Sequence, residues 1–210
     1  MTGENYGLKI LQNTRKPRGF WGKVLLLGMN TGHKPLSDWA MPYLPLREDT
    51  RVLDMGCGGG ANLAVLLRRC PKGRADGLDY SAESVAASRR KNAVKLGRRC
   101  TVTQGDIGAI PFPDNTYDAV TAFETVYFWP DIPRAFSEIQ RILKPGGKFL
   151  LACEMGDPSN TVWSERIDGL TIYSGEDLKA GLEAVGFTNI KLEKTKKVWF
   201  CIVAEKAMLR

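Results

Sequence analysis

Apolar runs of strand length alternate with amphipathic stretches along most of the chain. The runs of strand length are 51–55, 74–79, 100–105, 117–123 and 147–153. The stretches with helical periodicity between them are 60–69, 82–96 and 131–143. Strands that alternate with helices in this way are typical of a parallel sheet. The pattern therefore predicts an α/β fold with a doubly wound, mostly parallel sheet.

Local signals refine the ends of these elements. Ser81 is placed as the N-cap of the helix at 82–96, and Gly97 as its C-terminal stop. The Lys-Pro-Gly-Gly sequence at 144–147 predicts a turn that ends one helix and begins the next strand. Ser174 caps a further helix, and the runs at 187–193 and 197–204 predict a terminal antiparallel hairpin.

The first 47 residues differ in character from the rest. They contain short apolar runs and several aromatic residues, and Pro42 and Pro45 interrupt them before the first strand. We expect residues 1–47 to form an N-terminal helical cap over the cleft of a main domain at 48–210.

A glycine loop follows the first strand and carries the strongest functional signal. Gly56 and Gly58 belong to the sequence VLDMGCGGG, where missing side chains allow a sharp turn and a close approach to a ligand. With Ala61 they satisfy G-x-G-x-x-G/A, which alone suggests a dinucleotide. Asp54, however, would repel a pyrophosphate and attract an ammonium group. The loop therefore favours S-adenosylmethionine (SAM), which carries an ammonium group and no phosphate.

Acidic residues at the ends of the next two strands fit the nucleoside part of the same cofactor. Asp79 ends the second strand, where a carboxylate can accept hydrogen bonds from both ribose hydroxyls. Asp106 follows the third strand and is placed to accept from the adenine amino group, while Ile107 packs on the ring.

Five segments, taken together, resemble the motifs of the class I SAM-dependent methyltransferases. They are VLDMGCGGG (52–60), GLDYS (77–81), GDIGAIPFPDNTYDAV (105–120), FETVYFWPD (123–131) and LKPGGKFLL (143–151). The resemblance implies a seven-stranded sheet with a C-terminal antiparallel hairpin, and SAM as cofactor. The cofactor-binding residues that it implies are Asp54, Gly56, Cys57, Gly58, Asp79, Tyr80, Ser81, Asp106, Ile107, Phe123 and Glu124.

Three residues are candidates for the reacting site. Methyl transfer from a sulfonium mainly requires that the acceptor be positioned and water excluded, and it needs no metal. Glu124 and Tyr127 follow the fourth strand, and His33 belongs to the segment expected to close over the cleft. The alternatives are a capping or salt-bridging role for Glu124 and a structural hydrogen bond for His33.

Composition limits the other classes of function. The net charge of +7 comes from 30 basic and 23 acidic residues, and its clusters are interpreted as a solvated surface rather than a nucleic-acid track. The five cysteines form no CxxC pair and have no metal-ligand spacing with the single histidine, so we expect reduced thiols and no metal. Neither an apolar stretch of membrane-spanning length nor a signal-peptide pattern occurs, and a cytoplasmic location without membrane contact is expected.

The sequence thus predicts an enzyme that moves a methyl group from SAM to a small-molecule acceptor. An RNA methyltransferase is the alternative, although 123–126 lacks the Asx-Pro-Pro-aromatic pattern of enzymes that methylate base amino groups. A SAM-binding module without catalysis and a nicotinamide oxidoreductase are further alternatives. The acceptor is not defined, because it depends on the N-terminal segment and on 155–172, where Trp163 either lines the pocket or covers it.

Overall fold

The structure is a computed structural model that describes residues 32–196 and 198–208. In chain order, its elements are α3 (Lys34–Ala40), η1 (Met41–Tyr43), β1 (Arg51–Met55), α4 (Ala61–Arg69), β2 (Arg74–Asp79), α5 (Ala82–Lys91), η2 (Ala93–Lys95), β3 (Val102–Gln104), β4 (Tyr117–Phe123), η3 (Val126–Phe128), α6 (Ile132–Ile142), β5 (Leu143–Cys153), α7 (Gly175–Ala184), β6 (Phe187–Lys194) and β7 (Phe200–Lys206).

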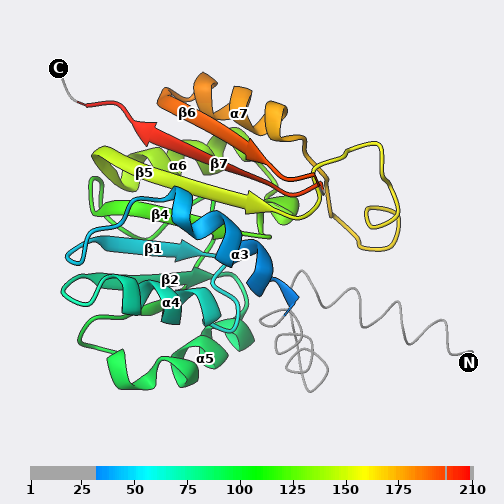
Figure 1. Cartoon of the computed structure of the whole chain (residues 1–210). Coiled ribbons are helices and arrows are strands. Elements are labelled where there is room, and N and C mark those ends of the chain that lie inside the picture. The colour runs from blue at the N-terminus through cyan, green and yellow to red at the C-terminus, as the bar shows by residue number, and fades with distance from the viewer. Residues whose placement is uncertain (1–31, 197, 209–210) are drawn as a thin grey trace, which may run out of the picture.

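A seven-stranded sheet runs through the described part of the molecule, in the order β3-β2-β1-β4-β5-β7-β6 (Figure 1). Strands β1 to β5 are parallel, and β7 is antiparallel to both of its neighbours. This confirms the predicted mostly parallel sheet and its C-terminal hairpin. The strand order reverses between β1 and β4, and ligands of such sheets bind outside the carboxyl ends of the strands at this point.

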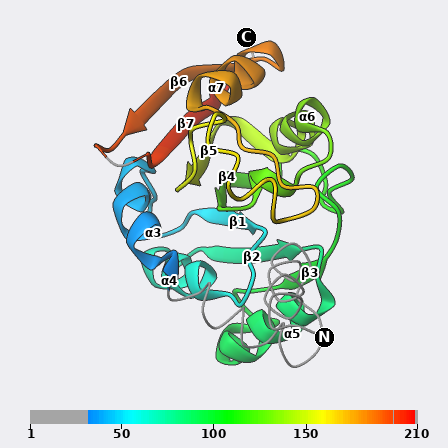
Figure 2. The ribbon, with the colours of Figure 1, turned by 90° about the vertical axis from the view of Figure 1, so that its right-hand side faces the viewer.

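Helices cover both faces of the sheet (Figure 2). On one face α3, α4 and α5 contribute to a core that includes Val52 of β1. On the other face α6 and α7 contribute to a core that includes Leu53 of the same strand. Successive side chains of a strand point to opposite faces, so a strand covered on both sides is apolar throughout. Among the described residues, no helix has the length and apolar character needed to cross a membrane.

The prediction of one helix over 82–96 is wrong for its last five residues. Helix α5 ends at Lys91, and the side-chain amide of Asn92 donates to the carbonyl oxygens of Ser88 (3.0 Å) and Gly60 (3.2 Å). An asparagine amide that bonds to the backbone offers an alternative to the helical hydrogen-bond pattern. The chain continues as the short turn η2, and Gly97, with φ of 73°, comes after that turn.

The prediction of a turn at 144–147 is also wrong, because β5 already begins at Leu143. Tyr117 pairs with Leu143 and Ala119 with Lys148, so the extra residues form an irregular segment within the strand. The third strand is shorter than expected and covers Val102–Gln104.

The predicted caps are confirmed: the hydroxyl of Ser81 accepts from the Ser84 N–H, and that of Ser174 accepts from the Asp177 N–H.

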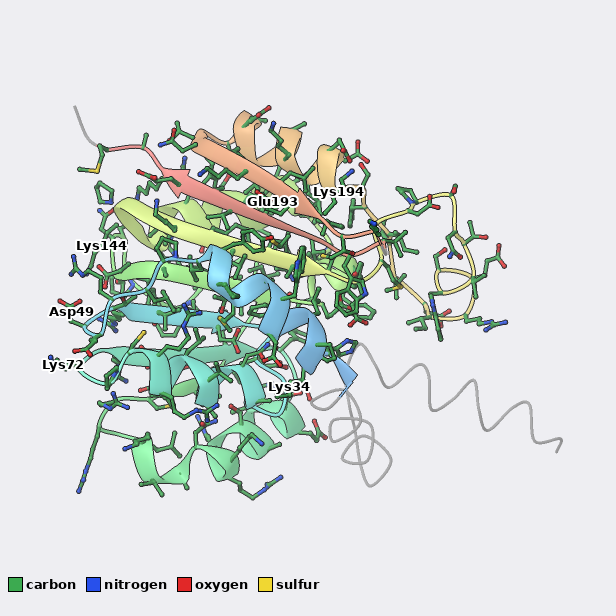
Figure 3. The ribbon with its side chains drawn as sticks, viewed as in Figure 1. Lys34, Asp49, Lys72, Lys144, Glu193 and Lys194 are labelled. Atoms are coloured by element: carbon green, nitrogen blue, oxygen red, sulfur yellow. The ribbon has the colours of Figure 1, made fainter. Side chains whose placement is uncertain are left out.

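Of the expected N-terminal cap, residues 1–31 lie outside the described residues, and a cover over the cleft stays a prediction. The described remainder packs on the sheet, where Leu36 and Ala40 of α3 are fully buried. His33 immediately precedes α3. The next residue, Lys34, lies toward the carboxyl ends of the strands, whereas Asp49 and Lys72 lie at the opposite end of the sheet (Figure 3).

Candidate active site

The glycine loop after β1 contains three left-handed glycines, and two of them, Gly56 and Gly58, have very different surroundings. Gly56 has φ of 65°, and a Cβ atom there would lie 2.1 Å from Cγ2 of Thr125, so the loop packs tightly on that residue. Gly58 has φ of 50°, and no atom lies within 4 Å of the position its Cβ would take. Only Gly58 therefore borders open space, which is the arrangement that a closely approaching ligand requires.

Asp79 joins this loop to the end of β2. One of its carboxylate oxygens accepts from the Gly58 N–H at 2.8 Å, and the other accepts from the Ser81 N–H at 2.8 Å. Burial raises the pKa of this carboxyl group, and the two backbone donors oppose that shift. The Ser84 side chain also hydrogen-bonds to this carboxylate. A carboxylate offers about four acceptor positions, so capacity remains for a ribose hydroxyl. Tyr80 beside it is 55% exposed and presents its ring at the surface.

Asp54 lies beneath the loop rather than beside open space. It is buried, and one of its oxygens accepts from the Thr121 hydroxyl at 2.8 Å. Burial raises its pKa to about 7, and the nearby charge of Asp79 acts in the same direction. Because Asp54 is buried and already paired with Thr121, it would influence a ligand through the electric field of its ionised form rather than by direct contact. The sequence could not show this depth.

A hollow of about 80 Å³ lies against the glycine loop. Its lining residues are His33, Lys34, Gly56, Cys57, Gly58, Gly59, Ala61, Asn62, Phe123, Glu124 and Thr125. The hydroxyl oxygen of Thr125 is buried there and has no hydrogen-bond partner among the described residues. Buried polar groups are rarely left without a partner, so Thr125 is a further candidate for contact with a polar ligand group.

A larger hollow of about 310 Å³ lies at the predicted adenine site. Its lining residues are Asp106, Ile107, Gly108, Ala109, Pro130, Asp131 and Arg134. One oxygen of Asp106 accepts from the Gly108 N–H at 2.7 Å, and Arg134 donates to the Gly108 carbonyl at 2.6 Å. The loop is thereby fastened to α6. Asp106 is exposed and Ile107 half-buried, so both face space that a planar ring can enter.

Cys57 lines the smaller hollow but is itself buried. Its sulfur lies 2.9 Å from the position that a Cβ of Gly77 would take, so it packs closely on β2. Burial raises the pKa of this thiol well above its ordinary value, which disfavours the thiolate a nucleophile needs. All five cysteines are free, as the sequence predicts, and all five are buried.

The three predicted catalytic residues lie in one polar cluster. Glu124 has φ of 58°, and its Oε1 accepts hydrogen bonds from the Tyr127 hydroxyl (3.0 Å) and from the Glu154 backbone N–H. Tyr127 also accepts from the Met155 N–H at 2.9 Å. Nδ1 of His33 lies 3.3 Å from Oε2 of Glu154 and 3.8 Å from Oε2 of Glu124. Burial raises the pKa of Glu124 to about 8 and the pKa of Tyr127 well above its ordinary value.

Sequence reasoning missed two residues of this site, Glu154 and Thr125. Glu154 directly follows β5, as Glu124 follows β4, and both strands end at the same edge of the sheet. The rule that placed Asp79 at the end of β2 therefore also indicates Glu154. The role of Thr125 depends on its contact with Gly56, which spacing along the chain does not reveal.

Residues 53–151 match the family model described as a methyltransferase domain. The strand order, the hairpin and the loop at the carboxyl end of β1 agree with this match. The match and the fold are consistent with a class I SAM-dependent methyltransferase, which is the class that the motifs predict.

Individual relatives are distant. The chain is 28% identical to 2-methyl-6-phytyl-1,4-hydroquinone methyltransferase 2 of Oryza sativa subsp. japonica, over 71% of this chain and 42% of the relative. It is 37% identical to demethylmenaquinone methyltransferase of Symbiobacterium thermophilum, over 50% of this chain and 42% of the relative. It thus spans less than half the length of either protein.

A similar fold occurs in a methyltransferase solved in complex with the Trm112 methyltransferase activator of Haloferax volcanii. The TM-score is 0.75 at 24% identity, and the match covers 86% of this chain and 94% of that chain. At this identity the similarity shows the fold alone.

Proposed function

We propose that the chain transfers the methyl group of SAM to a small-molecule acceptor and releases S-adenosylhomocysteine (SAH). The observation that carries this proposal is the open space at Gly58, between Asp79 and the hollow that Thr125 lines. Asp79 would accept from the ribose hydroxyls, and Asp106 with Ile107 would hold the adenine. The buried carboxylate of Asp54 would favour the ammonium group of the methionine part.

The reaction itself requires alignment and exclusion of water. The methyl carbon passes directly from sulfur to the acceptor, so the acceptor must lie in line with the breaking bond. His33, Glu124 and Tyr127 lie beside the smaller hollow, where that acceptor would approach. We propose that their hydrogen-bonding groups orient it.

We propose an apolar acceptor that carries oxygen, such as a substituted hydroquinone. Two relatives are named for a phytyl hydroquinone and for demethylmenaquinone, which supports this class. The segment 154–173 follows β5 at the carboxyl edge of the sheet (Figure 1). A hydrogen bond holds the end of this segment near η3: the Thr171 N–H donates to the Tyr127 carbonyl at 2.9 Å. Trp163 on this segment is 39% exposed and offers an apolar surface for such a ring.

The basic residues give less support to an RNA acceptor. Arg69 donates to the carbonyl oxygens of Met41 and Leu44, and Arg99 donates to those of Leu67 and Cys70. These guanidinium groups stabilise the fold through backbone contacts. The number of basic side chains available to bind phosphate groups is therefore smaller than the formal net charge suggests.

Incubation of the full chain with methyl-labelled SAM tests this proposal. The acceptors are prenylated hydroquinones, a fatty acid and mixed transfer RNA, each offered separately. We expect label in an organic-extractable product of the hydroquinone class and none in RNA. Label that enters RNA alone would contradict the proposal.

A further inference from the structure

We propose that His33, Glu124 and Glu154 form a binding site for one first-row divalent metal cation beside the methyl-donor pocket. The three residues come from three separate parts of the chain: the start of α3, the end of β4 and the end of β5. His33 and Glu154 are 121 positions apart, and Glu124 and Glu154 are 30 apart. Residues at such separations form no recognisable metal-binding motif in the sequence. The expectation of no metal rested on such spacing.

The distances suit a shared cation. One ligand atom from each residue, a ring nitrogen or a carboxylate oxygen, lies within 4.8 Å of the other two. Nδ1 of His33 is 3.3 Å from Oε2 of Glu154 and 3.8 Å from Oε2 of Glu124. Ligands about 2.1 Å from one metal ion are separated from each other by roughly 3.0 to 3.4 Å. Small side-chain rotations therefore bring all three atoms into a first coordination shell.

A second and independent observation is that the Glu124 carboxylate is already oriented. Its side chain is only 9% exposed, and its Oε1 is held by Tyr127 and by the backbone N–H of Glu154. Its Oε2 receives no hydrogen bond from the described residues and faces His33. Carboxylates that ligate a metal ion are usually held in place by hydrogen bonds of this kind.

Charge also favours a cation. Two carboxylates lie together around one imidazole, and the cluster lacks a Lys or Arg partner among the described ion pairs. Lys34, which follows His33 in the chain, is paired with Asp38 instead. Buried carboxylates are stable when a cation compensates them. A divalent ion would neutralise both groups.

The donor set indicates the kind of metal and its role. One imidazole nitrogen and two carboxylate oxygens suit Mn²⁺, Fe²⁺ or Zn²⁺ better than soft ions. Three protein ligands leave coordination positions open toward the smaller hollow, which His33 and Glu124 line. The role rests on the proposed function: an acceptor oxygen bound there would be held beside the methyl donor.

Titration of the full chain with MnCl₂, after treatment with EDTA and desalting, tests the site. Electron paramagnetic resonance measures free Mn²⁺, and the visible absorption of added Co²⁺ reports coordination. We expect one saturable Mn²⁺ site per chain. Glu154→Gln and His33→Gln should each weaken binding at least about tenfold, and Tyr127→Phe about tenfold, because it removes a hydrogen bond that orients Glu124.

Glu48→Gln is the matched control. Its carboxylate is 63% exposed and pairs with Lys72, which lies at the opposite end of the sheet (Figure 3), so Mn²⁺ binding should not change. Calorimetry with SAH on each variant shows whether the cofactor site is intact. No saturable binding of Mn²⁺ or Co²⁺, or binding that survives both ligand substitutions, would overturn the inference. SAH binding without metal binding would leave the proposed function standing.

Discussion

Gly58 and Gly56 share the left-handed conformation, but only Gly58 borders open space. We predict that Gly58→Ala abolishes detectable SAH binding, because the new methyl group occupies the volume that the ligand needs. The left-handed backbone costs an alanine roughly 1–2 kcal/mol, so the ligand-free fold should lose only a few degrees of Tm. Calorimetry and thermal unfolding measure the two effects.

Gly97→Ala provides the matched control for this substitution. Gly97 has φ of 73°, with nothing within 4 Å of the position of a Cβ, and it lies in the turn before β3. It should incur the same backbone cost and keep SAH binding. If Gly58→Ala and Gly97→Ala bind SAH equally well, the loop does not approach the cofactor.

Asp54 predicts a specific dependence of stability on pH. Burial raises its pKa from 3.8 to about 7, so the folded chain binds this proton more tightly than the unfolded chain. The contribution of Asp54 to stability is therefore greatest below 3.8. It is lost as pH rises and reaches its lower limit above about 7, where the buried group is ionised.

Asp54→Asn removes this titration and keeps an acceptor for the Thr121 hydroxyl. Without ligand, we expect the Tm of the variant to exceed that of the wild type at pH 8, and the difference to shrink toward pH 4. Groups far from Asp54 titrate equally in both proteins, whereas Asp79 and Cys57 are coupled to it, so the difference reports Asp54 together with these two neighbours. A Tm difference that is constant over this range would show that Asp54 is ionised throughout.

At the scale of elements, Asn92 joins the end of α5 to the start of α4. Its buried amide donates to the carbonyl oxygens of Ser88 and Gly60. We predict that Asn92→Ala lowers the free energy of unfolding by about 1–3 kcal/mol, since buried hydrogen bonds are lost. It should also weaken SAH binding, because Gly60 ends the glycine loop. Urea unfolding and calorimetry measure both.

Ser174→Ala is the comparison, since it removes a cap on α7 that is exposed. It should cost about 1 kcal/mol and leave SAH binding unchanged. Equal effects of Asn92→Ala and Ser174→Ala on SAH affinity would contradict the proposed link between α5 and the loop.

The sequence predicted elements well where periodicity decides them and less well where single contacts do. Apolar runs located β1, β2 and β4, because strands buried on both faces must be apolar. The end of α5 depends on two hydrogen bonds of Asn92, and the start of β5 depends on an irregular pairing with β4. Neither depends on periodicity, so both boundaries were misplaced.

At the scale of the whole molecule, the site depends on the sheet's topology. The carboxyl ends of parallel strands lie at one edge of the sheet, and this rule predicts from sequence that Asp79 and Glu124 lie at that edge, where the structure has them. The depth of Asp54 and the meeting of His33 with Glu154 were not predictable. Both depend on packing between elements that are distant in the chain.

The central claim is that this edge binds an adenosyl amino acid. Isothermal titration of the full chain with SAH tests it most directly, with NAD as the competing ligand and Asp79→Asn as the site variant. We predict saturable binding of SAH, no binding of NAD, and a loss of about 1–3 kcal/mol of SAH binding free energy in the variant. Binding of NAD in place of SAH, or undiminished SAH affinity in the variant, would contradict the account.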